Sequence, residues 1–225
     1  WHYDAKKIEV LNYRRKKLYN SNANILERIY WLLEDTKRYG TLPFAGLARS
    51  AFIAVQMLQS FLNIGILNQS DYEKFMKNIS TISSELTNDR LSIDKVSFLK
   101  RYGFLRPGTY DILSPRYDKA EHLYFDWNQS LQDIKTIEPF SFTISQKNKL
   151  EKILNFHKLN QNTENIFKFI KESIRLREMA KFNFTRNISD ALELIAKYAE
   201  DLNISRDEIS YCDINAFKQI HIDSH

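Results

Sequence analysis

Residues 164–184 read ENIFKFIKESIRLREMAKFNF, and this run sets the architecture expected for the whole chain. When each residue advances by about 100° around a helix axis, the apolar side chains of the run fall in one sector. The members of that sector are Ile166, Phe169, Ile170, Ile174, Ala180 and Phe184. The pattern predicts a long amphipathic helix with one face in a core.

Three charged residues fall on or beside this apolar sector. Arg177 lies in its middle, Lys181 lies within it, and Glu178 lies at its edge. Charges on a core-facing surface are costly unless they are paired or used. Periodicity leaves two alternatives open, a buried structural ion network or the lining of a polar cavity that receives an anionic ligand.

Further helices are expected on both sides of this run, and their ends carry recognisable signals. Capping boxes read Ser70-x-x-Glu73 and Ser205-x-x-Glu208, and Pro43 suits a first helical turn. The expected elements are one or two helices over 4–37, a turn at Tyr39-Gly40, a helix opened by Pro43, and helices at about 71–83, 93–102, from 146, and at about 188–203.

The segment from Tyr39 through Ser70 contains a single charged residue, Arg49. A membrane span needs about 20 predominantly apolar residues, and Arg49, Gln56 and Asn63 interrupt this segment. We therefore expect a central helix surrounded by others, with no membrane as partner. A lone Arg on such a helix extends to water, pairs with a buried carboxylate, or faces a site where its planar guanidinium holds a carboxylate or phosphate.

Residues 103–145 form an expected irregular segment that is rich in Pro, Gly and aromatic residues, including Tyr110. Loops longer than about 12–15 residues are uncommon and often functional. Arg106, Asp111 and Arg116 surround a Pro-Gly turn in this segment. They could converge on a zwitterionic ligand, or they could pin the loop to the helices through salt bridges.

Composition favours a packed, all-α, multi-helix chain. Hydrophobic residues make up 43% of the 225 residues, and there are only 5 Gly and 4 Pro. We expect one helical domain over 1–225. Because the chain opens with Trp1-His2-Tyr3 and no Met, we expect it to be an internal part of a longer polypeptide.

The net charge, the cysteine and histidine content and the absence of glycine motifs disfavour several classes of function. The net charge of +5 comes from 33 basic residues scattered among 28 acidic ones, which disfavours a nucleic-acid partner. The single cysteine, Cys212, excludes an internal disulfide and favours a cytoplasmic setting. The five histidines lack metal-ligand spacing, no nucleotide-binding glycine motif is present, and we expect no certain catalytic residue or metal site.

Three stretches, taken in order, resemble the central domain of phosphotransferases of the phosphoenolpyruvate-synthase type, which include rifampin phosphotransferases. They are Leu42–Ala54 (LPFAGLARSAFIA), Arg101–Tyr117 (RYGFLRPGTYDILSPRY), and Arg177–Arg186 (REMAKFNFTR) followed by Ser205–Ser210 (SRDEIS). The resemblance covers residues 25 to 218. The sequence of residues 105–111 is most similar to that of the subgroup of L-glutamine kinases that act in capsular polysaccharide biosynthesis.

The resemblance implies an ATP-dependent kinase in which an ATP-grasp domain and a swivelling phosphohistidine domain flank this one. ATP and Mg²⁺ would be bound outside these residues, and this chain alone would be inactive. The phosphohistidine would pass its phosphoryl group to a small acceptor, by this resemblance the amide of L-glutamine. The broader family commonly has His-Arg where this chain has Phe104-Leu105, so any role of that His is missing here or supplied elsewhere.

The same resemblance suggests roles within a set of substrate-binding residues. Arg106 or Arg49 would hold the acceptor carboxylate, Asp111 or Glu178 would take its ammonium group, and Arg177, Lys181 and Arg186 would stabilise the arriving phosphoryl group. Tyr110 and Arg116 complete the set. The alternatives are another acceptor in the same family (pyruvate, a sugar or an antibiotic), a non-catalytic helical interaction or nucleic-acid-binding module, and a structural spacer.

Overall fold

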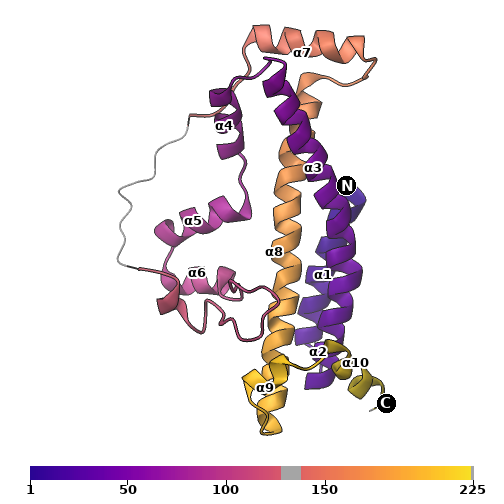
Figure 1. The fold of residues 1–225 in the computed structure, drawn as a ribbon, viewed down its shortest axis with the longest axis vertical. Coiled ribbons are helices and arrows are strands. Elements are labelled where there is room, and N and C mark those ends of the chain that lie inside the picture. The colour runs from indigo at the N-terminus through magenta and orange to yellow at the C-terminus, as the bar shows by residue number, and fades with distance from the viewer. Residues whose placement is uncertain (128–137, 224–225) are drawn as a thin grey trace.

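A computed structural model describes residues 1–127 and 138–223, which form helices joined by loops (Figure 1). No strand occurs within those two ranges, which confirms the predicted all-α class. In chain order the elements are α1 (His2–Tyr19), α2 (Ile25–Asp35), the π-helix η1 (Thr36–Thr41), α3 (Leu42–Asn63), α4 (Gln69–Lys77), α5 (Ile82–Ser92), α6 (Lys95–Tyr102), the short 3₁₀-helix η2 (Glu121–Leu123), α7 (Ile144–Phe156), α8 (Thr163–Asp201), α9 (Arg206–Ser210) and α10 (Ile214–Asp223).

The helix α8 is the axis of the molecule. It runs for 39 residues from the Asn162 cap, whose side chain accepts a hydrogen bond from the backbone of Asn165. The α1, α2 and α3 helices pack along one side of α8, and α5, α7 and α9 contact it elsewhere (Figure 1). Two separate helices were expected here, with a break after Phe184, and that expectation is wrong. Thr185 and Asn187 are buried within the helix, so packing outweighs their low helix propensity.

The predicted turn at Tyr39-Gly40 is also absent. The α2 helix passes through η1 directly into α3, so that Ile25–Asn63 is one helical rod of 39 residues. A methyl group at Gly40 would lie 2.7 Å from Cβ of Phe184. Only glycine therefore allows the rod to approach α8 this closely. The contact lies within η1, whose π-turn contains one residue more than an α-helical turn.

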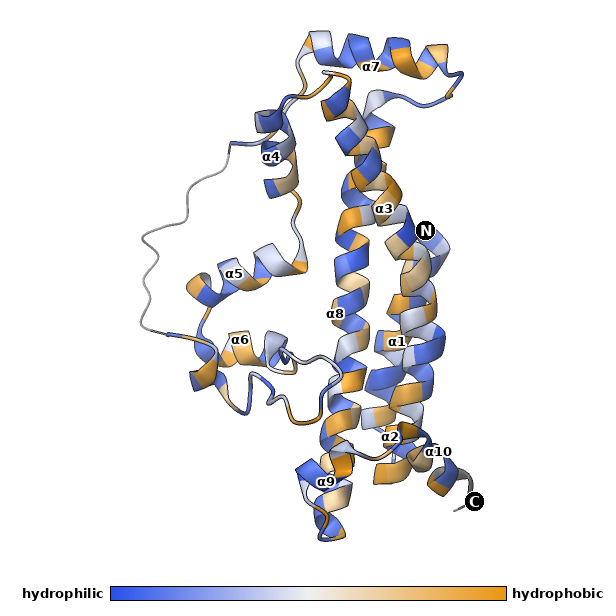
Figure 2. Cartoon of the chain, viewed as in Figure 1, coloured by the Kyte–Doolittle hydropathy of each residue, from blue (hydrophilic) through white to orange (hydrophobic). Residues whose placement is uncertain are grey.

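The α3 helix is not the central helix that its apolar sequence predicted. Only 28% of the most apolar window in the Ile25–Asn63 rod is buried, and Phe52 is 63% exposed (Figure 2 shows the apolar residues along α3). The charge-rich α8 takes the central place instead. By length and composition alone the rod could cross a membrane, a test that core helices also pass.

The core consists of four apolar clusters arranged along α8. One joins Ile170 and Ile174 to α3, α4 and α7, and a second joins Leu176 and Ala180 to α1 and α3. A third surrounds Phe184, and the last packs the C-terminal part of α8 against α2, α9 and α10. Successive turns of α8 therefore meet different partners, and the boundary between the first two clusters falls near Arg177.

The capping predictions are confirmed at one helix and corrected at another. Ser205 and Glu208 form the expected capping box of α9. At α4 the cap is Asn68 rather than Ser70, and its side chain accepts a hydrogen bond from the backbone of Asp71. That helix ends at Lys77, short of the predicted position, because a new N-cap at Thr81 begins α5.

The irregular segment predicted over 103–145 is confirmed in its described part. Residues 103–127 contain only the single turn η2, and α7 begins at Ile144 behind the Thr143 cap. Residues 128–137 of the predicted segment lie outside the described residues. The 103–127 loop packs beside α6 and against α8 (Figure 1).

Candidate functional site

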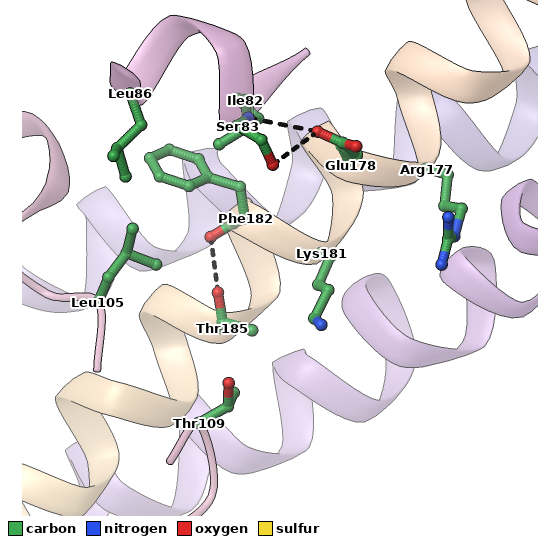
Figure 3. A pocket seen from close by; sticks show the side chains of 10 residues that line it. All are labelled: Ile82, Ser83, Leu86, Leu105, Thr109, Arg177, Glu178, Lys181, Phe182 and Thr185. Atoms are coloured by element: carbon green, nitrogen blue, oxygen red, sulfur yellow. Dashed lines mark hydrogen bonds between the residues drawn. The ribbon is translucent and has the colours of Figure 1, made fainter. Parts of the chain in front are cut away.

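An open cleft lies where α5 and the 103–127 loop face the middle of α8 (Figure 3). Its volume is about 330 Å³. The lining residues are Ile82, Ser83, Leu86, Leu105, Thr109, Arg177, Glu178, Lys181, Phe182 and Thr185. The three charged residues that sequence periodicity singled out on α8 therefore line one cavity.

Arg177 lies on the stripe of α8 that carries Ile170, Ile174 and Ala180, yet its side chain is exposed. The reason is that Ile174 belongs to one apolar cluster and Ala180 to the next, and the cleft opens between them. The guanidinium lies 5.6 Å from the ring centre of Phe52 on α3. It forms no ion pair with any described residue, so the alternative of a buried ion network is wrong.

Glu178 and Lys181 face the cleft in different directions. The Glu178 carboxylate turns toward α5, where it accepts hydrogen bonds from the backbone N–H of Ser83 at 3.3 Å and from its hydroxyl at 3.4 Å (Figure 3). Lys181 is exposed, extends between Arg177 and Thr185, and has no ion-pair partner in the described chain. The cleft thus carries two cations against one carboxylate, an excess of one positive charge.

Hydroxyl and apolar groups complete the cleft. Thr109 and Thr185 supply hydroxyls beside Lys181, and the Thr185 hydroxyl donates to the backbone carbonyl of Phe182 at 3.1 Å. Leu86, Leu105 and Phe182 form the opposite, apolar wall. This arrangement suits a small molecule with an anionic group at one end and an apolar or uncharged polar part at the other.

Sequence reasoning missed the cleft's uncharged lining residues. Thr109, Phe182 and Thr185 lie within the stretches that carry the resemblance, which is the only signal available for them. Periodicity could not identify them, because whether an uncharged residue faces a cleft depends on what packs opposite it. The lining residues as a whole come from three segments distant in sequence, namely α5, the loop and α8.

Arg106 does not face the cleft with a free guanidinium. Its side chain is 1% exposed, and its nitrogens donate to Ser189, to the carbonyls of Asp111 and Ser114, and to Glu193 at 2.8 Å. These bonds occupy every guanidinium N–H. Burial lowers the pKa of Arg106, and the Glu193 contact opposes that shift. The interpretation that Arg106 holds a ligand carboxylate is therefore corrected: Arg106 pins the loop to α8.

The other charged loop residues also bond within the chain. Arg116 donates to Asp118 and, at 2.9 Å, to Asp190 of α8. Asp111 is exposed and accepts a hydrogen bond from the backbone of Leu113. The predicted convergence of Arg106, Asp111 and Arg116 on one ligand is not present. Of the two alternatives for this loop, the geometry matches salt bridges that fasten it to the helices.

The three remaining predicted residues lie apart from the cleft lining. Arg49 is exposed on α3 and forms no ion pair with a described residue. The Arg186 guanidinium stacks over Phe104, 5.0 Å from the ring centre. Tyr110 is exposed and lines a different, apolar pocket near η1. The cleft thus gathers three of the predicted substrate-binding residues and leaves the other six outside.

No group of three or more His, Cys, Asp or Glu side chains in the described part of the chain could hold a metal ion. The chain matches no protein-family model, no curated protein and no solved structure.

Proposed function

We propose that this chain binds a small zwitterionic acceptor in the Arg177 cleft and serves as the substrate-binding domain of an ATP-dependent phosphotransferase. The acceptor we favour is L-glutamine, phosphorylated on its amide nitrogen by a phosphohistidine of a flanking domain. The carboxylate of such an acceptor would lie against Arg177 and Lys181, and its ammonium group against Glu178. The apolar wall of the cleft would contact its methylene groups.

One observation carries this proposal: the three stretches that resemble the phosphotransferases meet around Arg177. Phe52 of the first stretch contacts its guanidinium. Leu105 and Thr109 of the second stretch line the same cleft as Arg177 and Lys181 of the third. The second and third stretches thus line one cavity, and the first stretch reaches it only through the contact of Phe52 with Arg177.

The cleft residues would act by positioning and by charge. Phosphoryl transfer needs little covalent chemistry from the protein, because catalysis comes mainly from alignment and from stabilising the charge on the transferred group. The phosphorus–nitrogen bond to histidine breaks, the amide nitrogen forms a new one, and its released proton passes to the imidazole. Arg177 and Lys181 would contribute to positioning, because they would hold the acceptor through its carboxylate.

The test is calorimetric titration of the chain with L-glutamine. We expect binding in the wild type and a loss of about tenfold or more in affinity in Arg177→Met and in Lys181→Met, because each removes a charge-assisted contact. Lys171→Met is the matched control, since Lys171 is exposed on α8 outside the cleft. Equal affinities in all four proteins, or no binding in the wild type, would contradict the proposal.

A further inference from the structure

A second pocket lies at the other side of the 103–127 loop, against η1 and α10. Its volume is about 370 Å³, and it shares no lining residue with the Arg177 cleft. The lining residues are Leu33, Thr36, Lys37, Thr41, Tyr110, Ile188, Leu192, Ile214 and Lys218. Apolar side chains form most of its surface, and the only charged residues in the lining are the two lysines.

The α10 helix lines one side of this pocket and is fixed to the rest of the core. Phe217 is buried in the cluster formed by α2, α8 and α9, and its ring meets that of Tyr198 at 6.3 Å. One turn of helix separates Ile214 from Lys218, so both face the same side of α10. The burial of Phe217 therefore directs Ile214 and Lys218 toward the pocket.

Positive charge is in excess beside the pocket. The carboxylate of Glu34 has three cationic neighbours: Lys37, Arg38 at 3.6 Å and Lys218 at 4.0 Å. Asp213, at the start of the same C-terminal segment, is the other acidic group acting on Lys218. Partial burial is the largest effect on Lys218 and lowers its pKa, as expected for an ammonium group that lacks full solvation. Two carboxylates thus face three cations, which leaves an excess of one positive charge.

The π-helical turn contributes directly to this arrangement. Within η1, Thr36 is buried and donates its hydroxyl to the carbonyl of Leu32 at 2.6 Å, which leaves its methyl group for the pocket. Lys37 and Thr41 lie at the two ends of the same turn and both line the cavity. Such π-turns are frequent at functional sites, which agrees with a binding role here.

We propose that this pocket binds a monocarboxylate with a compact apolar body, such as a medium-chain fatty acid. The carboxylate would lie beside the ammonium groups of Lys37 and Lys218, both of which also contact Glu34. The apolar body would lie against Leu33, Ile188 and Leu192. A lining with apolar walls and cations at one end matches the two ends of such a molecule and disfavours a fully polar anion. This inference is independent of the proposed phosphotransferase function.

Calorimetric titration of the whole chain with sodium octanoate tests the proposal. Octanol shares the apolar body without the charge, and acetate shares the charge without the body. We expect octanoate to bind and both analogues to bind at least about tenfold more weakly, since each lacks one of the two contacts. Equal binding of octanol and octanoate, or no octanoate binding, overturns the proposal.

Variants locate the octanoate site. Lys218→Met should weaken octanoate binding about tenfold, because one of the two charge-assisted contacts is lost. Lys171→Met, on α8 and away from the pocket, should leave binding unchanged. Leu192→Trp should abolish binding by filling the cavity, with circular dichroism establishing that the helices are retained. If Leu192→Trp fails to fold, Lys218→Met decides alone, and unchanged octanoate affinity in Lys218→Met overturns the assignment.

Discussion

Thr109 and Tyr110 are adjacent in the chain, yet they line different cavities. Thr109 faces the Arg177 cleft, and Tyr110 faces the apolar pocket beside Lys37. The loop that carries both residues is held to α8 by the buried guanidinium of Arg106. The position of this one loop therefore shapes two sites, and the contacts of Arg106 are the first to examine by mutation.

Replacing Arg106 with Met should destabilise the protein by roughly 1–3 kcal/mol, because the carbonyls of Asp111 and Ser114 lose their donor, while Glu193 keeps its contact with Arg206. Urea unfolding followed by circular dichroism measures this change. Arg101→Met is the control, since Arg101 also pairs with two carboxylates but its side chain is 46% exposed. That control should cost less than about 1 kcal/mol. Similar losses in the two variants would contradict a fastening role for Arg106.

Gly40→Ala should lower the free energy of unfolding by about 1–3 kcal/mol, because its new methyl group would overlap Cβ of Phe184. Thermal unfolding measures the loss. Gly46→Ala is the matched control on α3, where the added methyl group meets only the movable carboxylate of Asp4. The Gly46 variant should be neutral or slightly stabilised, since Ala favours helix over Gly. A stable Gly40→Ala protein would refute the close contact.

The free energy of unfolding should decrease in acid because Glu193 becomes protonated. Burial alone would raise the pKa of Glu193, but hydrogen bonds from Arg206 and Arg106 outweigh it and hold that pKa below its ordinary value of 4.5. The unfolded chain then binds a proton more readily than the folded one, so this stabilisation is complete above pH 4.5 and is lost as pH falls through the folded pKa.

The variant Glu193→Gln tests this dependence. Its unfolding free energy should be lower than that of the wild type at neutral pH and should change less as pH falls below 4.5. Glu200→Gln, at an exposed position on the same helix, should keep the wild-type pH profile. Parallel pH profiles for Glu193→Gln and the wild type would show that another group causes the acid sensitivity.

Glu178→Gln should distinguish a zwitterionic acceptor from a purely anionic one. Loss of the carboxylate should weaken L-glutamine binding about tenfold, because its ammonium group loses an ionic partner. Binding of pyruvate, which has no ammonium group, should instead strengthen by a few-fold as repulsion is removed. Paired titrations measure both ligands, with Glu200→Gln as the control. A change of the same sign for both ligands would contradict the placement of Glu178 beside an ammonium group.

Local sequence signals were reliable where the deciding interactions are local. The Ser205–Glu208 capping box forms as predicted because its hydrogen bonds connect residues three apart. The helix predicted over 164–184 is present, because its apolar residues recur at helical spacing and place one stripe of side chains in the core. The same reasoning failed at Gly40 and after Phe184. At both positions the helix continues because another helix packs against it, and no window of neighbouring residues contains that contact.

The sequence by itself determined the all-α class, the long Pro- and Gly-rich loop, and the unusual placement of Arg177, Glu178 and Lys181 on an apolar stripe. Only the tertiary structure decided how those charges are used. Arg177 is exposed because the boundary between two apolar clusters lies at its position along α8. Arg106 is buried because Ser189 and Glu193 of α8 lie within hydrogen-bonding distance of its guanidinium. The physical reason is that an arginine's role depends on which groups lie within reach of its guanidinium, and those groups are 83 and 87 residues away along the chain.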